Sequence, residues 1–139
     1  LLRYASGARG SVTISQVSAG RKNSIQWEIG GSQAAAAWDG ENPDALWIGH
    51  RDEPNQILLR NPALMNETGV RAASLPGGHV EGFGDTFHAL FREIYRAIVA
   101  GRAPERPLFA TFADGHEEMV IGDAIARSAR EGRWVTVER

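Results

Sequence analysis

The sequence predicts an α+β fold in which a large, open, mainly antiparallel β-sheet carries two main helices packed on one face. Three observations support this prediction. Residues 1–60 contain short segments in which apolar and polar side chains alternate, as along half-buried strands. The turns between these segments are too short for parallel crossovers, which need about a dozen residues or more. Residues 83–100 and 112–130 instead repeat apolar side chains at helical spacing.

Strands are expected throughout the first part of the chain. The alternation is clear in residues 24–29, where Ile25, Trp27 and Ile29 point away from the polar residues between them. Turns rich in Gly, Asn, Asp and Pro separate the segments. The predicted strands are residues 1–5, 9–18, 24–29, 34–38, 45–50 and 56–60.

The second part of the chain is predicted to be mainly helical. Residues 61–82 form a long irregular connection, of a length that is often functional in ordered proteins. The helix over residues 83–100 places its apolar side chains in one stripe, and Gly101 is expected to end it. A second helix over residues 112–130 stops at Gly132, and residues 134–137 read as a final strand.

The sheet carries more large apolar side chains than two helices can cover. Val17, Trp27 and Trp47 lie on different strands and cannot all face the helices. An uncovered sheet face with such residues would exceed the apolar patch usual for a monomer. The second face is therefore expected to meet another surface.

Composition excludes several classes of partner. The 139 residues suit one domain, spanning 1–139, and carry a net charge of −2. With a pI near 6.1, neither nucleic acid nor an anionic membrane is an expected partner. No apolar run approaches the roughly 20 residues that span a bilayer. The absence of cysteine and of a signal peptide favours a reducing, cytoplasmic location.

The glycine-rich loop before the first helix is the candidate site. His79 and Glu81 lie among four glycines that give a small molecule access, so both are candidate substrate-binding residues. The alternative is a loop histidine that caps the helix or ties the loop to the sheet. As a metal motif this His-x-Glu pair is weak, because no further histidine stands at ligand spacing. We therefore predict no metal site.

Arg21 is the third candidate substrate-binding residue, since the basic turn over residues 21–23 could hold a carboxylate or phosphate. A solvated hairpin tip is the alternative. The acids of residues 114–118 suit a helix N-terminus and are interpreted as capping. No dinucleotide fingerprint, P-loop or serine triad is evident. Catalytic and cofactor-binding residues are therefore not expected within this chain.

Several segments resemble the C-terminal domain of the Gfo/Idh/MocA (glucose–fructose oxidoreductase-like) oxidoreductases. They are residues 15–23, 38–39, 41–43, 46–49, 75–83 and 128–135. The resemblance implies an open, mainly antiparallel sheet that contacts substrate and often forms a dimer interface. It also implies hydride transfer between NAD or NADP and a sugar, polyol or related carbohydrate. The family's Rossmann domain, its Glu-Lys-Pro motif and its Asp-x-x-x-His pair are not in this sequence, so His79 is carried over as a pocket residue only.

The resemblance leads to one main hypothesis. The chain is expected to be the C-terminal substrate-binding and oligomerisation domain of an NAD(P)-dependent carbohydrate oxidoreductase, inactive by itself and forming a homo-oligomer through the open sheet face. One alternative is a standalone, non-catalytic carbohydrate-binding or assembly module derived from that family. Another is a metal-dependent sugar isomerase or hydrolase built around His79 and Glu81.

Overall fold

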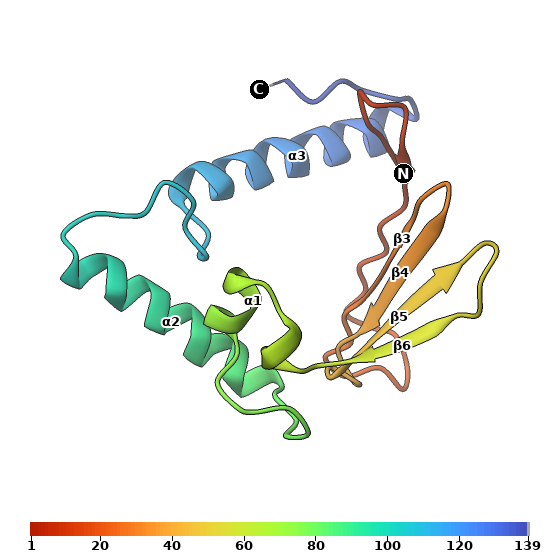
Figure 1. Ribbon diagram of the computed structural model, residues 1–139. Coiled ribbons are helices and arrows are strands. Elements are labelled where there is room, and N and C mark those ends of the chain that lie inside the picture. Colours follow the sequence, from red (N-terminus) through yellow and green to blue (C-terminus); the bar gives the residue numbers. More distant parts are fainter. Residues whose placement is uncertain (139) are drawn as a thin grey trace. The chain divides into compact units, whose positions relative to one another are not determined.

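A computed structural model describes residues 1–138 of the chain. The chain divides into two compact units, Leu1–Leu59 and Arg60–Arg139, which we describe separately. The first unit holds all the strands of the described residues, and the second holds all their helices (Figure 1). This arrangement of elements is an α+β fold, as predicted.

The first unit is built on a four-stranded antiparallel sheet. Its strands follow one another in space as in the sequence, in the order β3-β4-β5-β6 (Figure 1). Such a meander needs only short turns, which explains why Gly, Asn and Asp separate the strands. The strand bounds are β3 Gln26–Gly30, β4 Ala34–Asp39, β5 Ala45–His50 and β6 Gln56–Leu59. A separate pair joins β1 (Leu2–Arg3) to β2 (Arg9–Gly10).

The register gathers large side chains on one face of the sheet. Trp27 opposes Trp38, Trp38 opposes Leu46, and Leu46 opposes Leu58. Residues that oppose one another across antiparallel strands share a face. The rings of Trp27 and Trp38 stack with centroids 6.4 Å apart. The alternation predicted for residues 24–29 is thus present in the structure.

On β5, an aromatic ring covers a glycine. Gly49 is buried, and a Cβ atom built on it would come within 2.2 Å of the Trp47 ring. No side chain fits there unless the ring moves. A glycine inside a strand often marks such a close approach.

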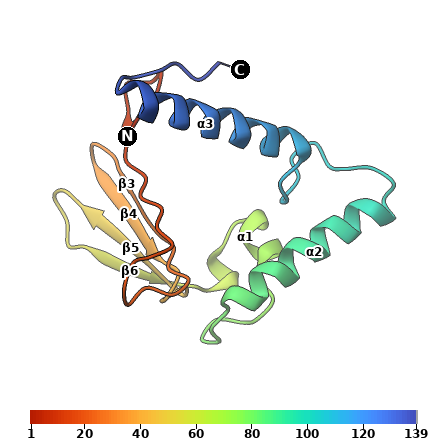
Figure 2. The ribbon, with the colours of Figure 1, turned by 180° about the vertical axis from the view of Figure 1, so that it is seen from behind.

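The second unit contains one 3₁₀ turn and three helices, seen from two opposite sides in Figures 1 and 2. Both views place α1 beside α2. Helix caps follow from the sequence: Asn66 caps α1, Thr111 and Asp114 form a capping box on α3, and Gly132 ends α3 with φ of 62°. The bounds are η1 Pro62–Leu64, α1 Glu67–Ala72, α2 Phe83–Val99 and α3 Phe112–Glu131.

Three predictions of secondary structure were wrong. Only Arg9–Gly10 of the strand predicted over 9–18 is paired, and residues 11–18 form no strand. Val12 and Ile14 were expected on one face of this strand and Val17 on the other, yet all three are exposed, by 63%, 86% and 91%. Alternation indicates which face a strand would bury, but a strand also needs a neighbour to satisfy its backbone.

The final strand predicted over residues 134–137 is also absent. That segment is attached to α3 by side chains, because Arg127 donates to the Thr136 carbonyl at 2.9 Å and Ser128 donates to the Arg133 carbonyl at 2.6 Å. The third error concerns residues 61–82, predicted to be irregular, where η1 and α1 form. Asparagine caps at Asn61 and Asn66 begin these two short elements.

Candidate functional site

A guanidinium group organises the loop that carries His79. Arg60, the first residue after β6, donates from Nη1 to the Leu75 carbonyl at 3.0 Å and from Nη2 to the Pro76 carbonyl at 3.2 Å. Its Nη2 also donates to the carbonyl of His79. One side chain therefore holds three carbonyl groups of the loop over residues 74–81, which we call the His79 loop.

Glu81 completes this arrangement from the other end of the loop. Its Oε2 forms an ion pair with Arg60 Nη1 at 2.9 Å. Its Oε1 accepts hydrogen bonds from the backbone amides of Ser74 at 2.6 Å and Leu75 at 2.8 Å. The side chains of Arg60 and Glu81 are only 12% and 10% exposed, so both charges are largely buried and both are paired. Buried charges are tolerated when they are paired and hydrogen-bonded in this way.

His79 itself lies in the turn that this pair encloses. Its amide donates to the Pro76 carbonyl at 3.3 Å, and Gly78 within the turn has φ of 83°, a conformation that favours glycine. The His79 side chain is exposed and makes no hydrogen bond to any residue in 1–138. The backbone of His79 is thus held while its imidazole is open to a ligand.

Arg92 of α2 also holds the beginning of the loop. Arg92 donates from Nη1 to the Ser74 hydroxyl at 3.2 Å and from Nη2 to the carbonyl of Arg71. The loop is therefore attached both to the residue that follows β6 and to the middle of α2. A loop held on both sides can present a side chain in one direction, which favours binding.

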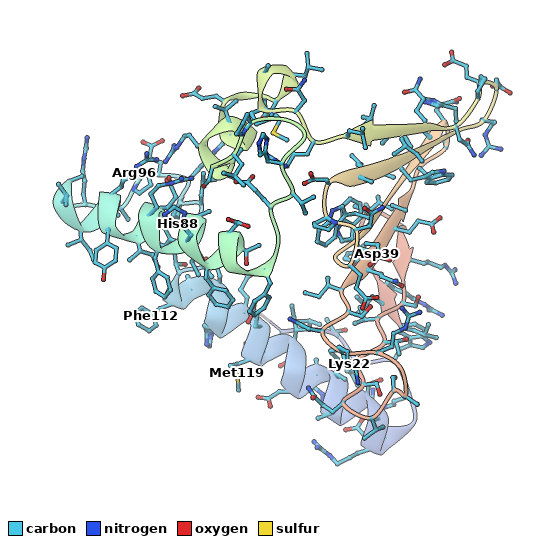
Figure 3. All side chains as sticks on the ribbon, turned by 90° about the horizontal axis from the view of Figure 1, so that it is seen from below. Lys22, Asp39, His88, Arg96, Phe112 and Met119 are labelled. Carbon is cyan, nitrogen blue, oxygen red and sulfur yellow. The ribbon has the colours of Figure 1, made fainter. Side chains whose placement is uncertain are left out.

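Glu93 on α2 is the one buried charged residue among those described, at 6% exposure. It pairs with Arg71 of α1 and, at 2.6 Å, with Arg96 of α2. Burial by itself would raise the pKa of Glu93, but hydrogen bonds and charges from Arg71 and then Arg96 outweigh it and lower that pKa. Arg96 lies toward the C-terminal end of α2, and His88 lies nearer its start (Figure 3). A hollow of about 480 Å³ adjoins this cluster and is also lined by Arg102 and Glu105.

A second hollow lies on the first unit. Its volume is about 490 Å³, and its lining includes Trp47 together with Ala37 and Ile57, which oppose Trp47 on the same face of the sheet. At its edge Gln26 donates to Asp39 at 3.0 Å. Aromatic surface with a few amide and carboxylate groups is typical of small-molecule sites. This hollow was not found by sequence reasoning, because the residues that line it come from all four strands of the sheet and only the fold brings them together.

Arg21, the third predicted site residue, belongs to the first unit. Its Nη1 lies 3.5 Å from Oε2 of Glu41, and both side chains are about half exposed. Its neighbour Lys22 is labelled in Figure 3. The structure therefore brings His79 and Glu81 together in one loop of the second unit, while Arg21 is engaged separately with Glu41 in the first.

Asp114, which the sequence places at a helix N-terminus, has a structural role. Asp114 accepts hydrogen bonds from the hydroxyl and the amide of Thr111, both at 2.6 Å, and the hydroxyl first and then the amide lower the pKa of Asp114. The interpretation of Asp114 as a capping residue is therefore confirmed. Residues 1–138 contain no group of three potential metal ligands and no helix that could cross a bilayer.

Arg60 is the residue of this site that sequence reasoning missed. It stands at the end of a predicted strand, where a single arginine gives no signal of its own. Glu81 is an acid inside an otherwise neutral loop, which indicates that a basic residue from outside the loop pairs with it. Spacing alone does not identify the partner, because the two residues are brought together only by the fold.

Comparison with known proteins identifies the family. Residues 1–137 match the oxidoreductase family, C-terminal alpha/beta domain, of Gfo/Idh/MocA proteins. Levoglucosan dehydrogenase of Pseudarthrobacter phenanthrenivorans is 28% identical over 142 residues, covering 99% of this chain and 35% of that protein. The chain thus spans about a third of that relative.

Solved structures agree with this match. A levoglucosan dehydrogenase in complex with NADH and levoglucosan has a TM-score of 0.81 at 28% identity, covering 99% of this chain and 37% of that one. An oxidoreductase from Sinorhizobium meliloti has a TM-score of 0.78 at 31% identity, covering 88% and 35%. The chain belongs to the Gfo/Idh/MocA oxidoreductases and corresponds to their C-terminal α/β domain.

Proposed function

We propose that this domain binds the substrate, and forms the homo-oligomer, of an NAD(P)-dependent oxidoreductase that acts on a sugar, polyol or related carbohydrate. Two comparisons support the substrate class and the cofactor: a levoglucosan dehydrogenase that is 28% identical, and a solved levoglucosan dehydrogenase in complex with NADH and levoglucosan. NAD or NADP, bound by a domain outside this chain, supplies the hydride chemistry. The residues of this chain bind and orient the substrate.

The observation that carries the proposal is the exposed imidazole of His79 on a held loop. A neutral imidazole has one nitrogen that donates and one that accepts, so it can satisfy both roles of a sugar hydroxyl. The loop backbone is held by Arg60 and Glu81, so little freedom remains to be lost when substrate binds. We assign His79 the substrate contact.

The other two predicted site residues have different surroundings. Both carboxylate oxygens of Glu81 already accept hydrogen bonds, so we assign Glu81 the role of holding the loop. Arg21 is half exposed beside Glu41 and keeps donors for a polar substrate. It remains a proposed secondary contact.

The exposed apolar residues of the sheet support the proposed oligomer. Trp47, Ile57 and Leu59 are 36%, 66% and 73% exposed and share one face of strands β5 and β6. Apolar patches of this kind mark interaction surfaces, and most soluble oligomers are symmetric assemblies of identical chains.

A cytoplasmic location, and the absence of nucleic-acid partners, remain proposals from composition.

The proposal is tested by steady-state kinetics on the intact oxidoreductase that carries this domain. A panel of sugars and polyols is offered with NAD⁺ and NADP⁺, and His79→Ala is compared with His88→Ala, which removes an exposed histidine of α2. Losing one hydrogen bond of about 1 kcal/mol should raise the substrate KM about fivefold in His79→Ala. Unchanged KM in His79→Ala, or an equal effect in His88→Ala, would contradict the role of His79.

The tryptophan-lined hollow favours a second candidate function, a carbohydrate-binding module that works without catalysis. Trp47 offers an aromatic ring, and Gln26 and Asp39 on the same sheet face offer hydrogen-bonding groups. This candidate predicts a sugar-dependent change in tryptophan fluorescence without nicotinamide cofactor, together with no turnover. Turnover that requires NAD⁺ or NADP⁺ would exclude it.

A further inference from the structure

We propose that Arg60 is a positioning residue for substrate binding, which acts by fixing the direction in which His79 presents its imidazole. This inference rests on the proposed function of His79 and extends it to a residue that need not touch substrate. Arg60 and His79 are 19 residues apart in the sequence, and Arg60 donates a hydrogen bond to the backbone carbonyl of His79.

The geometry of the guanidinium supports this role. Its donors reach the carbonyls of Leu75, Pro76 and His79. Arginine presents several donors in a rigid planar fork, whereas lysine is a compact point charge. Three carbonyls that share one rigid group cannot move independently, so the turn between Leu75 and His79 has one arrangement.

Breaking the Arg60–Glu81 pair costs free energy because both side chains are largely buried. The Arg60 side chain is 12% exposed and its partner Glu81 is 10% exposed. A charge in such a place is stable only while paired, so Arg60 cannot easily leave the loop for solvent. Glu81 holds the amides of Ser74 and Leu75, where the loop begins, and Arg60 holds the carbonyls further along. The two residues therefore bind different backbone groups of the loop: Glu81 binds amides and Arg60 binds carbonyls.

Fixing the carbonyl of His79 also constrains its side chain. The carbonyl and the Cβ atom are both attached through the same Cα, and the amide of His79 is bonded to the Pro76 carbonyl. With both peptide groups of the residue held, the Cα–Cβ bond points in one direction. Only the side-chain torsions of the imidazole remain to be set when a ligand binds.

The first test is a double-mutant cycle in the intact oxidoreductase, with variants Arg60→Ala, Arg60→Lys, His79→Ala and Arg60→Ala/His79→Ala. Arg60→Ala should raise the substrate KM about fivefold, as removal of His79 does, and leave the KM for the nicotinamide unchanged. The double variant should show the KM of His79→Ala alone. Arg60→Lys keeps the charge beside Glu81 but loses the fork, so its KM should lie between wild type and Arg60→Ala.

A merely structural role gives a different pattern. Arg60→Ala would then lower the melting temperature without coupling to His79, and the two effects on KM would multiply in the double variant. That result would overturn the proposal. A substrate KM for Arg60→Lys equal to that of wild type would also overturn it, because the charge alone would then suffice.

Hydrogen exchange separates failure of this inference from failure of the proposed function. In Arg60→Lys, the amide of His79 should exchange at least about tenfold faster than in wild type, because the turn opens more often. Exchange at the wild-type rate would overturn the positioning role, whatever the kinetics. Faster exchange, combined with wild-type KM in His79→Ala, would instead overturn the substrate role of His79 and leave the structural action of Arg60 established.

Discussion

Replacing Glu93 by Gln should weaken the contact between α1 and α2 more than replacing any other charged residue of the second unit by a neutral one. Glu93 is 6% exposed, and its two carboxylate oxygens pair with Arg71 and Arg96. Glutamine keeps the shape and one carbonyl acceptor but removes the negative charge. The change therefore isolates the charge-assisted part of the two contacts.

The expected cost follows from the exposure of the partners. A hydrogen bond to a charged group contributes roughly 1.5–3 kcal/mol when its surroundings are dry. The Arg71 and Arg96 side chains are 44% and 57% exposed, so solvent screens both contacts and re-solvates both cations after the substitution. We therefore expect about 1 kcal/mol for each contact, or about 2 kcal/mol together, which corresponds to a roughly 30-fold change in an opening equilibrium.

The same reasoning gives the pH dependence. The pKa of Glu93 is lowered below its ordinary value of 4.5, because the two arginines outweigh the effect of burial. A carboxyl group with a lowered folded-state pKa contributes stability that is present above the unfolded pKa and lost as pH falls through the folded pKa. The difference between wild type and Glu93→Gln should therefore be full at pH 7 and shrink below about pH 4.5.

Hydrogen exchange at the α1 amides measures this effect locally. The amides of Val70 and Ala73 donate hydrogen bonds to the carbonyls of Asn66 and Gly69, respectively. Both amides should exchange about 30-fold faster in Glu93→Gln than in wild type at pH 7. Glu105→Gln is the matched control, because Glu105 lines the same hollow but forms no ion pair within residues 1–138. An equal effect of the control, or a difference that does not shrink in acid, would refute the reasoning.

Three further predictions test the local structure. Gly49→Ala should lower stability by roughly 1–3 kcal/mol in thermal unfolding, because its Cβ would meet the Trp47 ring; Gly30→Ala, with open space around the added carbon, is the control. Asn66→Ala should cost about 1 kcal/mol and speed exchange of the Gly69 amide, which its side chain caps at 2.9 Å; an unchanged rate would contradict the cap. Asp114, whose pKa is lowered by Thr111, should titrate below 3.8 in NMR, with its stabilising effect on α3 present above the unfolded pKa and lost as pH falls through the folded one; a midpoint at or above 3.8 would contradict this.

Much of the fold was predictable because it depends on local patterns. The register of β3 against β4 follows the alternation of Ile25, Trp27 and Ile29, and both long helices begin and end near the predicted residues. Gly101 and Gly132 both adopt positive φ at helix ends, as their positions indicate. Packing of the two helices on one sheet face remains a prediction.

The errors arose where structure depends on partners distant in the sequence. Residues 11–18 alternate like a strand but have no neighbouring strand among the described residues. In residues 134–137, the Thr136 carbonyl instead accepts a hydrogen bond from Arg127 of α3. The candidate site shows the same limit: the loop and His79 stand out in the sequence, while Arg60 is recognised only when the fold places it against Glu81.

The most direct test of the account is to observe the His79 side chain while a sugar binds. Histidine ring signals of the intact oxidoreductase are recorded by NMR with reduced nicotinamide present, during titration with levoglucosan or with the best substrate of the kinetic panel. The His79 signal, assigned by its absence in His79→Ala, should shift in proportion to saturation, while those of His88 and His116 stay in place. Saturable sugar binding that leaves the His79 signal unmoved would contradict the claim that this domain contacts substrate through His79.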